Sequence, residues 1–297
     1  MQRAIHLQRT LLAPRLMSRT PMGRPHSSLQ YPIILSPPAP RKIMGSIIWI
    51  HGDNMPPQNF AELWFLSFKP KYFRMIIPRG IFQEKSLPEK PIWYSSDAAS
   101  HQITDGKQLK QSVEYIHNLI EEEKRFTSTK DIILAGYEQG GALATLAGIT
   151  YPEVLSGMLC CNGYAPSRKG FEREIEESAN RETQILCIHG QRDDKIPFSL
   201  ANESFENLKE SGFKGVEVFA SEGGHEIDEY QQKTIGIFFG NYDNTSMPRQ
   251  PQKTTTEEED DARLAQSVER TALNRVVGGS SPPLIWFFWL VAIHLDH

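Results

Sequence analysis

Short apolar runs alternate along this chain with longer segments in which apolar residues recur every three or four positions. The runs have the length and β-branched composition of buried strands, and the longer segments have the spacing of helices. The predicted strands cover 31–35, 46–50, 73–78, 132–134, 155–161, 185–188 and 216–220, and predicted helices cover 105–124, a segment ending at 151, 172–178, 199–211 and 228–239. Strands and helices that alternate in this way predict a mostly parallel sheet with helices on both faces.

The stretch 131–151 carries the most specific local pattern. A β-branched strand runs into a tight turn, and small and apolar residues then continue at helical spacing until Pro152. Gly136 and Gly140 stand two residues on either side of Glu138. Only positions without a side chain allow a helix to pack so close to its strand. This is the geometry of a nucleophile elbow, usually spelled Gly-x-Ser-x-Gly, with a glutamate at the serine position.

Two further motifs follow the elbow in a meaningful order. The predicted strand 185–188 is followed by Asp193, and the last predicted strand is followed by His225. Nucleophile position, acid and histidine is the chain order of α/β-hydrolases. On these motifs the segment from about residue 31 to residue 240 resembles the acyl-protein thioesterase family, also called the phospholipase/carboxylesterase family. The resemblance implies the α/β-hydrolase fold.

The resemblance also implies roles for residues outside the triad. The His-Gly turn after the second predicted strand would supply one backbone N–H of an oxyanion hole from Asp53, and Gln139 would supply the other. Trp93 and Tyr94 match the loop that lines the acyl-chain site, although plain core packing explains these two aromatic residues equally well. Ile196, in the loop that carries the acid, is assigned to the same substrate pocket.

Three positions depart from the family pattern. Glu138 replaces the serine, Asp53 stands where the family usually has a leucine, and Ser95 replaces an acid after the Trp-Tyr pair. Without a hydroxyl group, acyl-enzyme chemistry at position 138 is not available. The glutamate is expected either to turn into the oxyanion hole, near a helix N-terminus, or to pair with His225. Either arrangement removes a general base.

The sequence therefore predicts a thioesterase or carboxylesterase of the type that hydrolyses palmitoyl-protein thioesters and carboxylic esters, with weak or no activity because of Glu138. One alternative is a pseudoenzyme that binds an acyl chain or a protein partner without turnover. Another is a hydrolase with the Glu138 carboxylate as nucleophile, and glutamate is one methylene longer than the aspartate found in relatives of this fold. A third is slow hydrolysis by a water that His225 activates. The expected ligand is an acylated protein or a small acyl ester.

Composition narrows the classes of protein. The chain has 297 residues, of which 39% are hydrophobic and 23% charged, so one large α/β domain fits with room to spare. A net charge of −4 indicates no nucleic-acid partner. All three cysteines lie in apolar runs, which predicts buried side chains rather than a disulfide or a metal site. No cofactor is expected. A cytoplasmic location is expected, and no sequence pattern predicts an oligomeric state.

The domain itself is expected over residues 30–245. Residues 1–29 contain five arginines and no acidic residue, which predicts either a disordered extension or a mitochondrial presequence. Residues 246–297 begin with an acidic low-complexity linker and continue with stretches that resemble translated arms of a transfer RNA gene, so we interpret this tail as a gene-model artefact or a fused reading frame. Its apolar end, 284–295, is shorter than the roughly 20 residues that span a membrane.

Overall fold

The structure, a computed structural model, describes residues 31–37, 43–53, 55–61, 72–83, 90–97 and 99–239. All of them belong to one compact unit that begins at Tyr31. The predicted N-terminal extension, residues 1–29, and the predicted tail, residues 246–297, lie outside the described residues.

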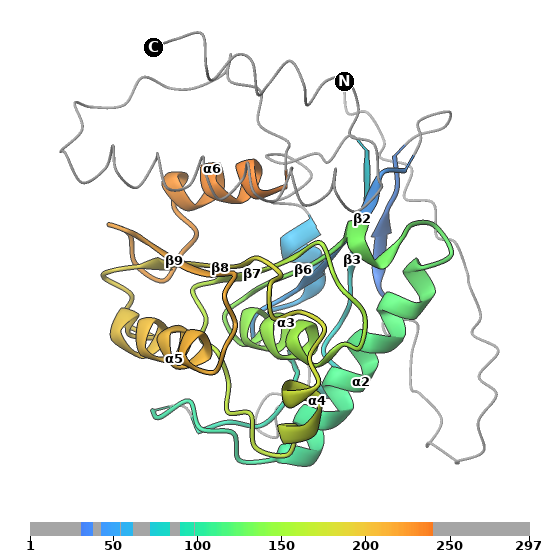
Figure 1. Cartoon of the computed structure of the whole chain (residues 1–297). Helices are drawn as coiled ribbons and strands as arrows, with labels where there is room; N and C mark the ends of the chain where they lie inside the picture. Colours follow the sequence, from blue (N-terminus) through green and yellow to red (C-terminus); the bar gives the residue numbers. More distant parts are fainter. Residues whose placement is uncertain are drawn as a thin grey trace, which may run out of the picture. The chain divides into compact units, whose positions relative to one another are not determined.

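A seven-stranded sheet forms the centre of this unit (Figure 1). Its strands are β1 (Ile33–Leu35), β2 (Gly45–Ile50), β3 (Phe73–Ile77), β6 (Ile132–Tyr137), β7 (Gly157–Cys161), β8 (Ile185–Gly190) and β9 (Val216–Ser221). The spatial order is β1-β3-β2-β6-β7-β8-β9. Only β1 runs antiparallel to its neighbour, and the other pairs are parallel. This confirms the predicted fold class, and β1 is the edge strand that the sequence indicated.

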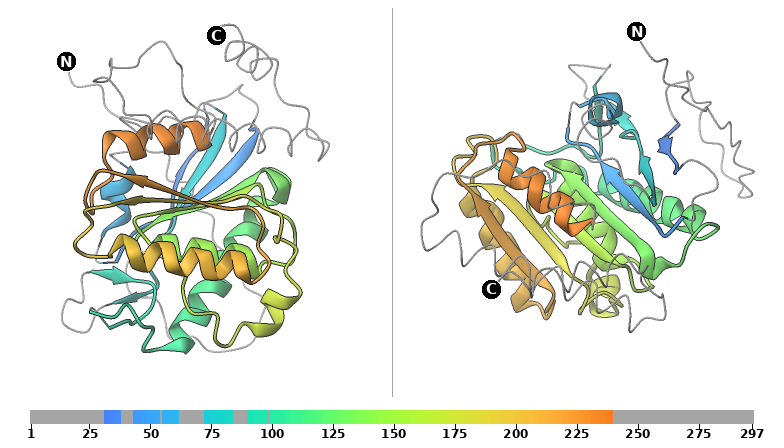
Figure 2. Two further views of the ribbon diagram at one scale, coloured as in Figure 1. Left: turned by 60° about the vertical axis from the view of Figure 1, so that its left-hand side comes forward. Right: turned by 90° about the horizontal axis from the view of Figure 1, so that it is seen from above.

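Helices cover both faces of the sheet. Figure 2 shows α6 (Glu229–Phe238) on one face, and α2 (Gly106–Glu123), α3 (Gln139–Thr150) and α5 (Phe198–Glu210) on the other. The strand β6 explains this layering, because Ile132 and Leu134 pack in the core beneath α2 and α3, whereas Ile133 and Ala135 pack with α6. Side chains alternate along a strand, so a strand that is apolar at every position is buried on both faces.

Two smaller features complete the framework. A short helix, α4 (Glu172–Glu176), follows β7, and the two-residue strands β4 (Phe82–Gln83) and β5 (Pro91–Ile92) form a separate antiparallel ribbon. The helix α2 begins where the sequence predicted, because the side chain of Asp105 accepts hydrogen bonds from the N–H groups of Lys107 and Gln108. Among the described helices, none combines the length and the apolar character needed to cross a membrane.

The turn from β6 to α3 has the geometry predicted for the elbow. Glu138 is the single residue between strand and helix, and its φ of 56° lies in the left-handed region. A Cβ atom at Gly136 would lie 2.4 Å from the carbonyl oxygen of Gly140, and one at Gly140 would lie 2.2 Å from that of Ile50. Both glycines are therefore required by close backbone approach, which leaves Glu138 at the top of the turn.

Candidate active site

Four of the predicted site residues meet at the carboxyl ends of the parallel strands. Asp53 follows β2, Glu138 follows β6, Asp193 follows β8 and His225 follows β9. A pocket of about 70 Å³ opens here, lined by Asp53, Ser96, His101, Glu138, Gln139, Tyr164, Lys195 and Ile196. Pockets for drug-sized ligands are larger, at roughly 300 to 1,000 Å³. In this structure the pocket thus has room for a small group only.

Asp193 and His225 form a close acid–histidine pair. The Nδ1 atom of His225 lies 2.9 Å from Oδ2 of Asp193, and the backbone N–H groups of Lys195 and Ile196 each donate to Oδ1 at 2.9 Å. His189 approaches Oδ2 to 3.2 Å. Burial acts to raise the pKa of Asp193, but the hydrogen bonds from His189, His225 and Ile196 outweigh it and hold this pKa well below its usual range. Asp193 is therefore an ionised carboxylate that orients the imidazole.

The backbone of His225 is fixed as firmly as its side chain. The hydroxyl of Tyr137 and the side-chain amide of Asn162 both donate to the His225 carbonyl oxygen at 2.6 Å. The second ring nitrogen, Nε2, points at the elbow and lies 3.8 Å from Oε1 of Glu138. That separation allows electrostatic attraction but is too long for a hydrogen bond. The pairing of Glu138 with His225 that the sequence left open is therefore not a hydrogen-bonded one.

The Glu138 carboxyl group instead contacts a lysine. Its side chain is 5% exposed, and the ammonium of Lys195 contacts Oε1 while lying 3.0 Å from Oδ1 of Asp53. Oε2 lies against Gly52, where a Cβ atom would approach it to 2.6 Å. The carboxyl groups of Glu138 and Asp53 also hydrogen-bond to each other. The Glu138 side chain makes no capping hydrogen bond to α3.

Charge balance explains the protonation of this cluster. Burial, followed by the charge and hydrogen bond of Asp53, raises the pKa of Glu138 to about 8, although Lys195 opposes the shift. Burial acts to raise the pKa of Asp53 too, but its hydrogen bond with Glu138 and the charge of Lys195 lower it overall. One ammonium therefore balances one carboxylate, and the second carboxyl group stays protonated near neutral pH. A protonated Glu138 is a poor nucleophile.

Gln139 holds the aromatic loop in place through its side chain. Its Oε1 accepts a hydrogen bond from the N–H of Trp93 at 2.8 Å, and its Nε2 donates to the carbonyl oxygen of Tyr94 at 2.9 Å. Trp93 and Tyr94 are fully buried in the core, and neither lines the pocket. The role of both as walls of an acyl site stays a prediction. So does the oxyanion hole, although Gln139 and Asp53 both line the pocket beside Glu138.

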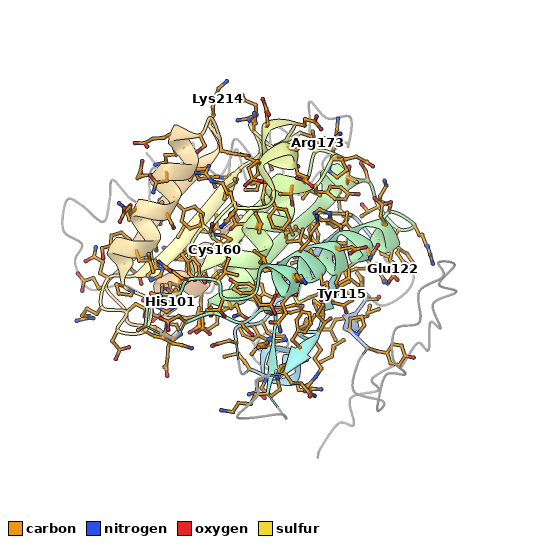
Figure 3. The ribbon with its side chains drawn as sticks, turned by 90° about the horizontal axis from the view of Figure 1, so that it is seen from below. His101, Tyr115, Glu122, Cys160, Arg173 and Lys214 are labelled. Carbon is orange, nitrogen blue, oxygen red and sulfur yellow. The ribbon has the colours of Figure 1, made fainter. Side chains whose placement is uncertain are left out.

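Lys195 and His101 were missed by sequence reasoning. His101, labelled in Figure 3, lies on the loop between β5 and α2 with a left-handed φ of 55°. Its Nε2 lies 3.0 Å from the carbonyl oxygen of Lys195, and its own carbonyl oxygen accepts a hydrogen bond from Tyr164. The signal for Lys195 was available: a cation two residues after the predicted acid, in a site whose nucleophile position carries a glutamate. No pattern near His101 distinguished it from an exposed loop residue.

Within the described ranges, no group of three or more His, Cys, Asp or Glu side chains is placed to hold an ion. The cysteines Cys160, Cys161 and Cys187 are unpaired thiols buried in the sheet. Figure 3 labels Cys160, which lies in β7 beneath α3.

A mostly parallel sheet with an elbow, an acid and a histidine at its carboxyl edge defines the α/β-hydrolase class. Within that class, residues 30–239 match the phospholipase/carboxylesterase family, and the chain belongs to it. This confirms the family that the motifs indicated.

Individual relatives are similar at low identity. Acyl-protein thioesterase 1 of Gibberella zeae is 27% identical over 190 residues, which cover 59% of this chain and 81% of the relative. Acyl-protein thioesterase 1 homolog 1 of Dictyostelium discoideum is 29% identical over 161 residues, or 52% of this chain and 70% of the relative. The crystal structure of Zea mays acyl-protein thioesterase 2 has a TM-score of 0.59 at 20% identity, covering 68% of this chain and 94% of the other. At 20% identity, the similarity to this crystal structure supports a shared fold only.

Proposed function

We propose that this chain is a thioesterase- and carboxylesterase-like protein that binds an acylated ligand and has weak or no hydrolytic turnover. The observation that carries the proposal is the state of Glu138: a buried carboxyl group at the nucleophile position, in contact with Lys195 and hydrogen-bonded to Asp53. Position 138 carries no hydroxyl that could form an acyl-enzyme. The carboxyl group is mostly protonated near neutral pH and is then a poor nucleophile.

The preserved pair of Asp193 and His225 does not restore catalysis by itself. In the serine mechanism, the histidine takes a proton from the nucleophile while the acid fixes the ring. Here Nε2 of His225 faces Oε1 of Glu138 at 3.8 Å, so the space where a hydroxyl and an attacked carbonyl would stand is occupied by a carboxyl group. The weak turnover that this proposal allows is attack by water on a bound ligand, promoted by binding alone and not by His225.

The expected ligand is an acylated protein or a small acyl ester. Support comes from the family and from relatives that are named acyl-protein thioesterases. The pocket combines an apolar wall from Ile196 with polar groups from Tyr164 and Lys195, which suits an acyl group joined to a carbonyl. We also propose a cytoplasmic location, supported by three buried cysteines that are all unpaired, as is typical of a reducing compartment.

The test compares the full native chain with His225→Ala on an acetyl thioester, whose acyl group suits a pocket of about 70 Å³. We expect thiol release by the native chain to equal that of the variant, because neither forms an acyl-enzyme. We also expect saturable binding of a small acetyl ester to both proteins, measured by isothermal titration calorimetry. Turnover by the native chain that falls at least tenfold in His225→Ala would contradict the proposal. An absence of saturable binding would contradict its ligand-binding part.

A further inference from the structure

We infer that Lys195 is a second residue, besides Glu138, that suppresses turnover, because it clamps the Glu138 and Asp53 side chains together across the pocket. The inference rests on the proposed function and deepens it. It assigns the loss of turnover to the contact between Glu138 and Lys195, not to the missing serine alone.

The position of the side chain supports a clamp. The Lys195 side chain is 46% exposed, whereas that of Glu138 is 5% exposed, so the lysine lies on the solvent side of the carboxyl group that it contacts. Its ammonium also lies 3.0 Å from Asp53, which is 142 residues away in the chain. One cation thereby joins the loop after β2 to the turn after β6. All three residues line the same small pocket.

The backbone N–H and the carbonyl oxygen of Lys195 both have polar partners. The direction of the side chain is therefore fixed by the backbone before it contacts Glu138 and Asp53. Its N–H donates to Oδ1 of Asp193 at 2.9 Å, and its carbonyl oxygen lies 3.0 Å from Nε2 of His101. His101 is itself held by Tyr164, whose hydroxyl donates to its carbonyl oxygen at 3.2 Å. A side chain that starts from a fixed backbone loses less conformational entropy when it binds its partners. The clamp is therefore built into the same loop that orients the histidine.

A serine introduced at position 138 would lie close to the Lys195 ammonium. The lysine ammonium and Nε2 of His225 both face the Glu138 carboxyl group, so both would face the new hydroxyl. A nearby positive charge disfavours the imidazolium that must form when the histidine accepts a proton. The ammonium and its Asp53 partner also line the pocket in which the acyl carbonyl would react. Restoring the serine alone should thus leave the site impaired.

The first experiment measures kcat/KM for a butyryl thioester with full-length Glu138→Ser and with the double variant Glu138→Ser, Lys195→Met. Methionine keeps much of the length of lysine without its charge. We expect the double variant to be at least about tenfold faster, and a further His225→Ala change to abolish that activity. Equal and measurable rates for the two serine variants would overturn the inference, whether or not the native chain is inert.

A second experiment tests the contact between Lys195 and Glu138 without measuring turnover. Reductive methylation with formaldehyde, followed by mass spectrometry, gives the labelling rate of each lysine. We expect Lys195 to react at least about fivefold faster in Glu138→Ala than in the native chain, because it loses a buried partner. The matched control is Lys214, whose partner Glu182 is 71% exposed, and whose rate should change less than about twofold in Glu182→Ala.

An unchanged Lys195 rate in Glu138→Ala would overturn the inference. If neither serine variant turns over, the labelling result alone decides. Turnover by the native chain that depends on His225 would contradict the proposed function, and the labelling comparison would still test the clamp.

Discussion

The two sides of the active site are held by different kinds of interaction. On one side, Asp193 and His225 are fixed by hydrogen bonds that each involve a backbone group. Backbone amides donate to the Asp193 carboxylate, and the His225 carbonyl oxygen accepts bonds from the side chains of Tyr137 and Asn162. On the other side, Glu138 is fixed by charged side chains. The comparison shows why the acid–histidine geometry persists without a serine, because nothing that positions it depends on the nucleophile.

The second side depends on charge balance instead. Glu138, Asp53 and Lys195 share one positive charge and one proton between two carboxyl groups. Such a cluster responds to pH and to substitution of any member, whereas hydrogen bonds to backbone amides are insensitive to both over the neutral range. The two sides are therefore expected to differ in how mutation and pH affect them.

The largest effect is expected from Gly140→Ala, which breaks the elbow beneath Glu138. The new Cβ atom would lie 2.2 Å from the Ile50 carbonyl oxygen and 2.3 Å from that of His51, and neither backbone group can move cheaply. We expect a loss of more than about 4 kcal/mol in the free energy of unfolding, measured by urea denaturation. The control is Gly106→Ala, where the added atom meets nothing within 4 Å and the change should stay within about 1 kcal/mol.

The next effect concerns pH and the charged side of the site. The pKa of Glu138 rises from 4.5 to about 8 on folding, so between these values the native state binds more protons than the unfolded state. The resulting stability is fully present below pH 4.5 and is lost as the pH rises through about 8. The lowered pKa of Asp193 acts in the opposite sense, since its stability is lost only as the pH falls below 3.8.

Comparison of the native chain with Glu138→Gln isolates this contribution. Between about pH 5 and about pH 9 we expect the native chain to lose roughly 2 to 4 kcal/mol more than the variant, because glutamine cannot ionise. Urea denaturation at several pH values gives the difference. Parallel stability curves for the two proteins would show that Glu138 ionises normally in the folded state.

The smallest effect is expected on the backbone-held side. Tyr137→Phe removes the hydroxyl that donates to the His225 carbonyl oxygen at 2.6 Å, and Asn162 still donates to the same oxygen. We expect a cost of about 1 kcal/mol in the free energy of unfolding. Tyr31→Phe is the control, because Tyr31 is 58% exposed and its loss should cost less than about 0.5 kcal/mol. Equal costs for the two variants would deny the Tyr137 hydroxyl a part in holding the histidine loop.

The apolar pattern was sufficient for the fold. Runs such as Ile132-Ile133-Leu134 have no polar position that would prefer water, so the sequence indicated strands buried on both faces, and β6 is such a strand. The start of α2 and the elbow followed from local chemistry, a capping aspartate and two glycines. Local rules suffice where the cause of an element lies within a few residues of it.

Local sequence patterns did not predict the side-chain contacts inside the active site. The sequence placed Gln139 in an oxyanion hole, and the structure adds that its side chain bonds Trp93 and Tyr94 from 45 or 46 residues away. It left two arrangements for Glu138 open, and neither includes the lysine that the structure brings to it. Both questions turn on side-chain contacts between distant segments, which spacing along the chain does not encode.

By itself, the sequence determined the order of elements, the elbow and the succession of Glu138, Asp193 and His225, because each follows from nearby apolar, glycine or capping residues. The tertiary structure alone decided that Lys195 meets both Glu138 and Asp53. The physical reason is the sheet order, in which parallel pairing brings the carboxyl ends of β2, β6 and β8 to one edge. Charges from loops far apart in the chain must then balance one another within a few ångströms.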